Sequence, residues 1–162
     1  MTNKEAKAVI FKWLKDRDFT RIKIPGNSGA FDYIHSLGEF NVLISFYKDR
    51  FNESYIFEVG CYFDYCEYGE ATIRVLDLPS NSHLRKGHSQ GLYYGEGELT
   101  EEQLIQCLNE MFDKYLKPYY VQGKKYLKEI ILKESTLFGE GYSIAKGARE
   151  EINKMFGLKT RP

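Results

Sequence analysis

The chain has 162 residues, 43% of them apolar, which suffices for one sizeable hydrophobic core and predicts a single domain over residues 1–162. Its 23 basic and 23 acidic residues balance, so the net charge gives no reason to expect nucleic acid or a membrane surface as partner. No stretch approaches about 20 consecutive apolar residues, so we expect no membrane span, and no signal peptide is apparent. Three cysteines fit a reducing compartment, and we expect a cytoplasmic protein.

The charges are distributed unevenly along the chain. Residues 1–30 and 117–162 have an excess of Lys and Arg, whereas residues 31–116 hold fifteen Asp and Glu against six Lys and Arg. Such asymmetry bears on partners rather than on fold. An acidic middle segment would suit a basic partner if folding gathers its charges on one surface.

An amphipathic helix is predicted over residues 3–17, because apolar side chains recur there with helical spacing. The apolar stripe consists of Ala6, Val9, Ile10, Trp13 and Leu14. Lysines off that stripe are expected to form a solvated basic face, with binding of an anionic ligand as the alternative.

Five strands are predicted after this helix, at residues 20–24, 31–35, 40–47, 55–63 and 71–76. The central pair shows period-two alternation, which places Phe40, Val42, Ile44 and Phe46 on one face and is typical of strands with one buried face. The connections are too short for helical crossovers, so an antiparallel meander is expected. Residues 92–94 are a candidate for one further short strand.

The C-terminal half is predicted to be helical. Thr100 and Gln103 form a capping-box pattern, and the apolar spacing that follows extends to Pro118, which should end or bend the helix near Lys117. Helical spacing resumes at residues 126–131, and a last helix is expected from Ile144 to Phe156. The predicted fold class is therefore α+β: one N-terminal helix, a meander of about five strands, and two to three C-terminal helices packed on one face.

One pattern suggests a metal site. Cys61-x4-Cys66 followed by His83-x4-His88 would supply two thiolates and two imidazoles, a donor set that suits tetrahedral zinc. The spacing differs from that of a zinc finger, and alternation places Cys61 with the apolar residues of its strand. The competing interpretation is a buried cysteine and loop histidines, and no cofactor is predicted.

Catalysis has little support in the sequence. There is no nucleophile elbow, and alternation places Asp32 and His35 on opposite faces of their strand. Glu58 could act as a general base in a cleft or be an ordinary solvent-facing glutamate. The alternative hypothesis is an enzyme or an anion-binding protein that uses the 79–98 loop. Four side chains of that loop would bind the anion: His83, Arg85, Lys86 and His88.

The leading hypothesis is a non-enzymatic module that binds and masks a protein partner. It rests on a stretch at the end of a central strand in which tyrosines recur among carboxylates, a combination suited to protein recognition. The expected contact residues are Glu58, Tyr62, Asp64, Tyr65, Glu67, Tyr68 and Glu70. The competing interpretation is a tyrosine-rich strand end packed under the helices.

Nucleic-acid binding is a third hypothesis, since the two basic terminal segments could meet in space. The first helix would then share one patch with six C-terminal residues: Lys124, Lys125, Lys128, Lys146, Arg149 and Lys154. No nucleic-acid-binding motif accompanies these residues.

The N-terminal layout resembles a family of small bacterial domains of unknown function. The residues that carry the resemblance are Leu14–Arg21, Phe31 and Asn41–Phe46. Members of that family open with a helix, continue with a Gly-Phe-x-Arg-like step, and run into a β-meander followed by helices. Asp18 stands at the glycine position of that step. The resemblance implies a fold and transfers no catalytic motif. More loosely, the size and the acid–tyrosine character are similar to immunity proteins, antitoxins and phage-encoded inhibitors of defence systems.

Overall fold

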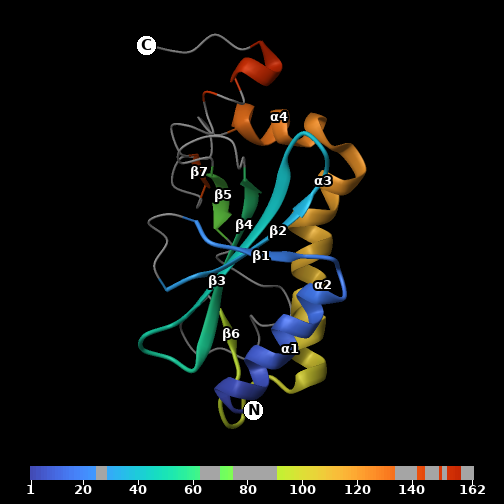
Figure 1. The fold of residues 1–162 in the computed structure, drawn as a ribbon. Coiled ribbons are helices and arrows are strands. Elements are labelled where there is room, and N and C mark those ends of the chain that lie inside the picture. Colours follow the sequence, from blue (N-terminus) through green and yellow to red (C-terminus); the bar gives the residue numbers. More distant parts are fainter. Residues whose placement is uncertain are drawn as a thin grey trace.

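The computed structural model describes residues 1–24, 29–62, 70–74, 91–133, 142–144, 150 and 153–157. One antiparallel sheet is covered by helices on one of its faces, which confirms the predicted α+β class (Figure 1). The helical elements are α1 (Asn3–Lys15), α2 (Glu101–Met111), the π-helical turn η2 (Phe112–Leu116), α3 (Lys117–Gln122) and α4 (Lys124–Lys133). The strands are β1 (Thr20–Ile22), β2 (Phe31–Ser36), β3 (Asn41–Lys48), β4 (Ser54–Tyr62), β5 (Glu70–Arg74), β6 (Leu92–Tyr93) and β7 (Tyr142–Ile144).

The sheet is a meander extended by two short strands. Strands β1 to β5 follow one another in sequence order, each antiparallel to the next, and β7 pairs with the outer edge of β5. The predicted strand at residues 92–94 is confirmed as β6, which pairs with the beginning of β4. The prediction that Ile144 belongs to a helix is wrong, because Ile144 pairs with Ala71 in β7. The open edge of β5 offers unpaired backbone groups, and their pairing overrides the local helical spacing.

The core lies between the sheet and the helices. The side chains that alternation predicted for one face, Phe40, Val42, Ile44 and Phe46, are all at most 4% exposed and belong to one apolar cluster with residues of α1 and α2. Phe46 stacks on the neighbouring Phe57 with ring centroids 5.3 Å apart. Burial of the whole apolar cluster stabilises the fold, since apolar area removed from water contributes roughly 25 cal/mol per Å².

Strand β3 is buried on both faces, which alternation did not predict. Every residue from Asn41 to Phe46 is buried, including the polar Ser45 on the face turned away from the helices. Ser45 donates a hydrogen bond of 2.6 Å to the carboxylate of Asp32 on β2, and Asp32 is itself only 3% exposed. Leu43 and Asn41 on the same face are 0% and 8% exposed, so the second face of β3 is shielded from water from Asn41 to Ser45.

Helix α1 begins and ends with defined caps. At its start Thr2 and Glu5 form a reciprocal capping box. At its end the amide of Phe19 donates to Leu14 and that of Asp18 to Lys15, the bonding pattern of a Schellman motif. This motif requires a left-handed residue, and Asp18 has φ +57°. The residue that stands at the family's glycine position therefore adopts the conformation that favours glycine.

The predicted interruption before Pro118 takes the form of a π-helical turn. The amide of Lys117 donates to the carbonyl of Phe112, five residues earlier, and α3 begins directly afterwards. Proline has no amide hydrogen, and its ring displaces the carbonyl four residues before it. The wider π turn absorbs this mismatch, so the helix direction continues instead of ending.

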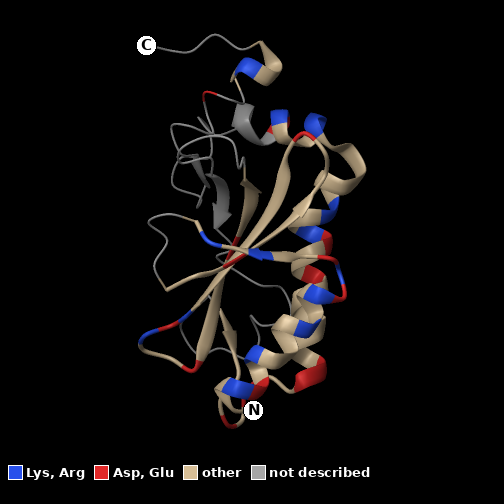
Figure 2. Cartoon of the chain, viewed as in Figure 1, with Lys and Arg blue, Asp and Glu red and all other residues tan. Residues whose placement is uncertain are grey.

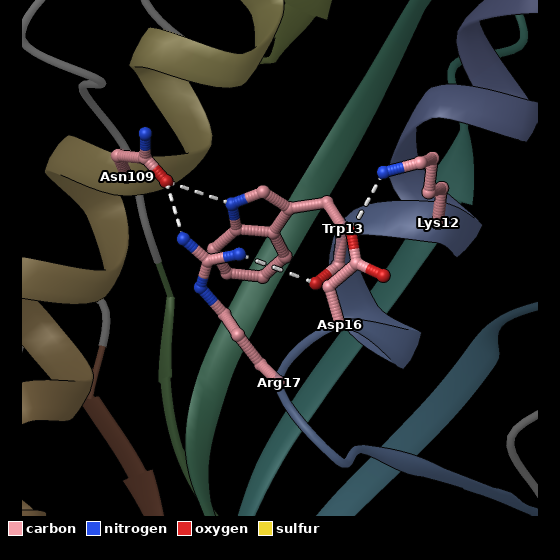
Figure 3. Close-up of polar contacts among 5 residues, drawn as sticks. All are labelled: Lys12, Trp13, Asp16, Arg17 and Asn109. Carbon is pink, nitrogen blue, oxygen red and sulfur yellow. Dashed lines mark hydrogen bonds and ion pairs between the residues drawn. The ribbon is translucent and has the colours of Figure 1, made fainter.

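Helices α1 and α2 are joined by a polar contact at the rim of the core (Figure 3). The side-chain oxygen of Asn109 accepts hydrogen bonds from the Trp13 indole at 2.9 Å and from the Arg17 guanidinium at 2.7 Å. The same guanidinium lies 4.2 Å from the centre of the Trp13 ring. One amide oxygen thus fixes Trp13 of α1 and Arg17 of the turn that follows it. Burial lowers the pKa of Arg17, and Asp16 partly offsets this effect.

Candidate functional site

The sheet has an apolar face under the helices and a second face that is more polar, although Ile34, Leu43 and Ile56 also lie on it. We call this second face the polar face, and the strand register assigns to it alternate positions of β2, β3, β4 and β5. We define the polar row as the positions that the strand register aligns across this face: Asp32, Ser45, Glu58 and Arg74. The sequence contains these residues far apart, and only the pairing of four strands brings them into one line.

Glu58 lies on the polar face as alternation predicted. It is directly opposite Ser45 on β3 and opposite the position of Arg74 on β5. Glu58 is half-buried, whereas Ser45 is only 1% exposed.

Tyr62 and Glu70 also belong to the polar face. Tyr62 ends β4, and it is paired with Glu70 at the beginning of β5. Its carbonyl accepts a hydrogen bond of 3.0 Å from the side chain of Asn41 on β3, which fixes the strand end. Tyr62 is half-buried. Three of the seven expected contact residues, Glu58, Tyr62 and Glu70, therefore share one face near one end of the β4–β5 pair.

The other expected contact residues lie outside the part of the chain that the structure describes. These are Asp64, Tyr65, Glu67 and Tyr68. The same holds for the four side chains of the alternative anion site, His83, Arg85, Lys86 and His88. Both hypotheses stay predictions at those positions.

The burial of Cys61 argues against the predicted zinc site. Cys61 is fully buried in the apolar cluster, as alternation predicted, and burial strongly raises the pKa of its thiol. A thiol that resists ionisation is a poor metal ligand, because metals bind the thiolate. Cys66, His83 and His88 lie outside the described residues, and within the described ones no group of three His, Cys, Asp or Glu could hold a metal ion.

The Asp32–His35 pair is divided between the two faces, as predicted. Asp32 bonds to Ser45 on the polar face, whereas the His35 ring lies 5.3 Å from the ring of Tyr120 on α3. Burial raises the pKa of Tyr120 to about 12. Asp32 and His35 lie on opposite faces of β2, so they do not form a dyad with each other.

The basic segments do not form a single patch within the described residues. Helix α1 packs against α2, whereas α4 follows α3 at the opposite end of the molecule (Figures 1 and 2). One lysine of α4, Lys124, is paired with Glu39 from the turn between β2 and β3. Lys146 and Arg149 lie outside the described residues. This arrangement separates the lysines that the nucleic-acid hypothesis needed side by side.

No protein-family model, curated protein or solved structure matches the chain. The resemblance to the family of small bacterial domains therefore stays a prediction. Within the described residues no helix is both long enough and apolar enough to cross a membrane.

Proposed function

We propose that this chain is a protein-binding module that masks a basic partner protein through the polar face at the β4–β5 end. The observation that carries the proposal is the register, which aligns Tyr62 with Glu70 and puts Glu58 on the same face. The helices occupy the other face (Figure 1), and on this one Glu58 and Tyr62 are partly exposed, whereas Leu43 and Ser45 of β3 are buried. The proposed contact is therefore confined to the β4–β5 end.

The chemistry of these residues suits protein recognition. Tyrosine contributes a large, rigid contact area with a polar tip, and carboxylates steer a basic partner towards the surface. The acidic stretch predicted to follow Tyr62 would enlarge the same surface. The role would be that of an inhibitor, in the manner of immunity proteins, antitoxins or phage-type anti-defence proteins.

We propose further that the protein acts in the bacterial cytoplasm and is encoded by a bacterium or a phage. Its support is the state of the thiols, since Cys61 and Cys107 are both free and fully buried. Such thiols behave as small apolar side chains and need no oxidising compartment.

The test is a charge reversal at the polar face. The double variant Glu58→Lys/Glu70→Lys and the control Glu96→Lys/Glu150→Lys change the net charge equally, and Glu96 and Glu150 are exposed elsewhere. The partner captured from producing cells by the wild type should bind the first variant at least 10-fold more weakly and the control within 2-fold. Equal binding to both variants contradicts the proposal.

A milder pair of substitutions guards against misfolding. Glu58→Gln/Glu70→Gln removes the charges with little change in side-chain shape. Circular dichroism should show the wild-type fold, and binding should weaken with a smaller dependence on salt concentration. A correctly folded variant that keeps full affinity and full salt dependence also contradicts the proposal.

A further inference from the structure

The tip of the β3–β4 hairpin presents an exposed aromatic ring. Phe51 is 93% exposed, whereas every other phenylalanine that the structure describes lies in the apolar cluster or packs against it. The hairpin tip, which we define as residues 48–53, projects away from the helices (Figure 1). An exposed ring at a projecting tip adds nothing to the core of this chain.

The backbone of the hairpin tip is held in place by one carboxylate. Asp49 accepts hydrogen bonds from the Phe51 amide at 2.8 Å, from the Asn52 side chain at 2.9 Å and from the Ser54 hydroxyl at 3.4 Å. The Asp49 amide in turn donates to the Ser54 carbonyl at 2.9 Å. The ring is thus carried on a defined turn, and a preorganised turn loses less conformational entropy on binding.

One of the two carboxylates of the hairpin tip is engaged within the turn. Asp49 accepts the hydrogen bonds of the turn, whereas Glu53, directly before β4, is exposed and its carboxylate lies beside Gly95. Lys48 and Arg50 are exposed on either side of Asp49. The exposed groups next to Asp49 and Phe51 are therefore two cations, with one exposed carboxylate at the foot of the turn.

We propose that the hairpin tip is a docking anchor that inserts Phe51 into an apolar pocket with an acidic rim on a partner protein. Binding energy at protein interfaces is concentrated in a few anchors that fill pockets on the partner. The cations of Lys48 and Arg50 complement carboxylates around such a pocket. The same charges would repel a basic rim.

A protein pocket fits these observations better than a lipid surface. Stable attachment to a membrane takes two signals, such as two lipid chains or one chain with a polybasic patch. The hairpin tip supplies one ring and two cations, fewer than the roughly four to eight basic residues of a polybasic patch. A lipid surface is therefore an alternative outcome of the test below.

This inference goes beyond the proposed function, because it uses the opposite end of β4. The hairpin tip precedes Ser54, at the start of that strand, whereas Tyr62 ends it. Nine residues of strand, at about 3.3 Å each, separate the two ends. Either surface can fail without the other.

The test replaces Phe51 with the photo-crosslinking residue p-benzoylphenylalanine in cells that naturally produce the protein. The matched control carries the same residue at Val121, which is 74% exposed on α3. Irradiation should yield a protein adduct at position 51 that the control lacks. Mass spectrometry should locate it among apolar residues flanked by Asp or Glu.

The affinity of each variant for the purified partner is then measured. Phe51→Ala should weaken binding at least 10-fold, Phe51→Leu less, and Val121→Ala within 2-fold. Lys48→Glu/Arg50→Glu should weaken binding at least 10-fold, whereas Glu58→Lys/Glu70→Lys tests only the proposed function. The inference is overturned by no adduct, by an adduct to lipid or to a second copy of the chain, or by unchanged binding of Phe51→Ala.

Discussion

At the scale of the residue, Asn109 provides the polar contact between α2 and the C-terminal end of α1. Its oxygen accepts both the Trp13 indole and the Arg17 guanidinium (Figure 3). Asn109→Leu removes that acceptor while keeping the volume, which leaves two donors unsatisfied at a half-buried site. Unsatisfied buried donors cost about 1–3 kcal/mol.

We therefore expect Asn109→Leu to lower the free energy of unfolding by about 1–3 kcal/mol. Urea denaturation followed by tryptophan fluorescence measures this directly, since Trp13 is the one tryptophan of the chain. Gln106→Leu, one turn earlier on α2, is a suitable control, because its bond to Glu110 is exposed. A loss for Asn109→Leu no larger than that of the control would contradict this account of the contact.

Asp18 provides a second prediction about stability at the scale of the residue. Its left-handed backbone, φ +57°, is strained for a residue with a Cβ atom and relaxed for glycine. The left-handed conformation costs a residue with a Cβ atom roughly 1–2 kcal/mol, and the greater freedom of glycine in the unfolded chain offsets about 0.5–1 kcal/mol of that. Asp18→Gly should therefore raise the free energy of unfolding by about 0.5–1 kcal/mol. Thermal unfolding of the variant measures the change, and Asp18→Val should lower the melting temperature. Destabilisation by glycine would show that the Asp18 side chain makes a larger contribution than the backbone.

The buried hydrogen bond between Ser45 and Asp32 provides a third prediction at the scale of the residue. Ser45→Ala removes a donor from a carboxylate that is only 3% exposed. Loss of a hydrogen bond to a charged group costs about 1.5–3 kcal/mol. Chemical denaturation should show a loss of that size, whereas Ser36→Ala, at the exposed end of β2, should be nearly neutral. Similar values for the two variants would mean that the bond contributes little.

At the scale of the element, the hairpin tip should respond to pH through Asp49. Burial alone would raise the pKa of Asp49, but hydrogen bonds from Asn52, Phe51 and Ser54 outweigh it and lower the pKa. A lowered pKa means that the carboxylate stabilises the turn above the unfolded value of about 3.9. That stabilisation is lost as the pH falls through the folded pKa.

The amide resonance of Phe51 reports this titration. Its chemical shift, followed by NMR from acid to neutral pH, should change with a midpoint below the unfolded value of about 3.9. Asp49→Asn should abolish the titration while keeping part of the turn. A midpoint at or above the unfolded value would contradict the hydrogen-bonded geometry of the tip.

Much of the element order follows from the sequence. Period-two alternation placed Phe40, Val42, Ile44 and Phe46 correctly, and the capping pattern at Thr100 located the start of α2. Other features required tertiary context. Ile144 joins β7 because the edge of β5 is available, and a π turn before Pro118 lets the helices continue. Local patterns do not contain the position of a distant sheet edge.

At the scale of the whole molecule, the candidate site was predicted only in part. Alternation put Glu58 on the polar side of its strand, but the register that brings Glu70 opposite Tyr62 and lines up Asp32 with Ser45 depends on how four strands pair. The exposure of Phe51 could not be predicted from the sequence either, because only the folded core shows which phenylalanine lies outside it.

The central claim is that a partner protein binds the polar face at the β4–β5 end. Site-specific photo-crosslinking from Tyr62 tests it most directly, with the same crosslinker at Tyr115, on the helical side of the molecule, as the control. The account predicts one dominant protein adduct from Tyr62, lost in Glu58→Lys/Glu70→Lys, and no such adduct from Tyr115. Equal labelling from both positions, or labelling from Tyr62 that survives the charge reversal, would contradict it.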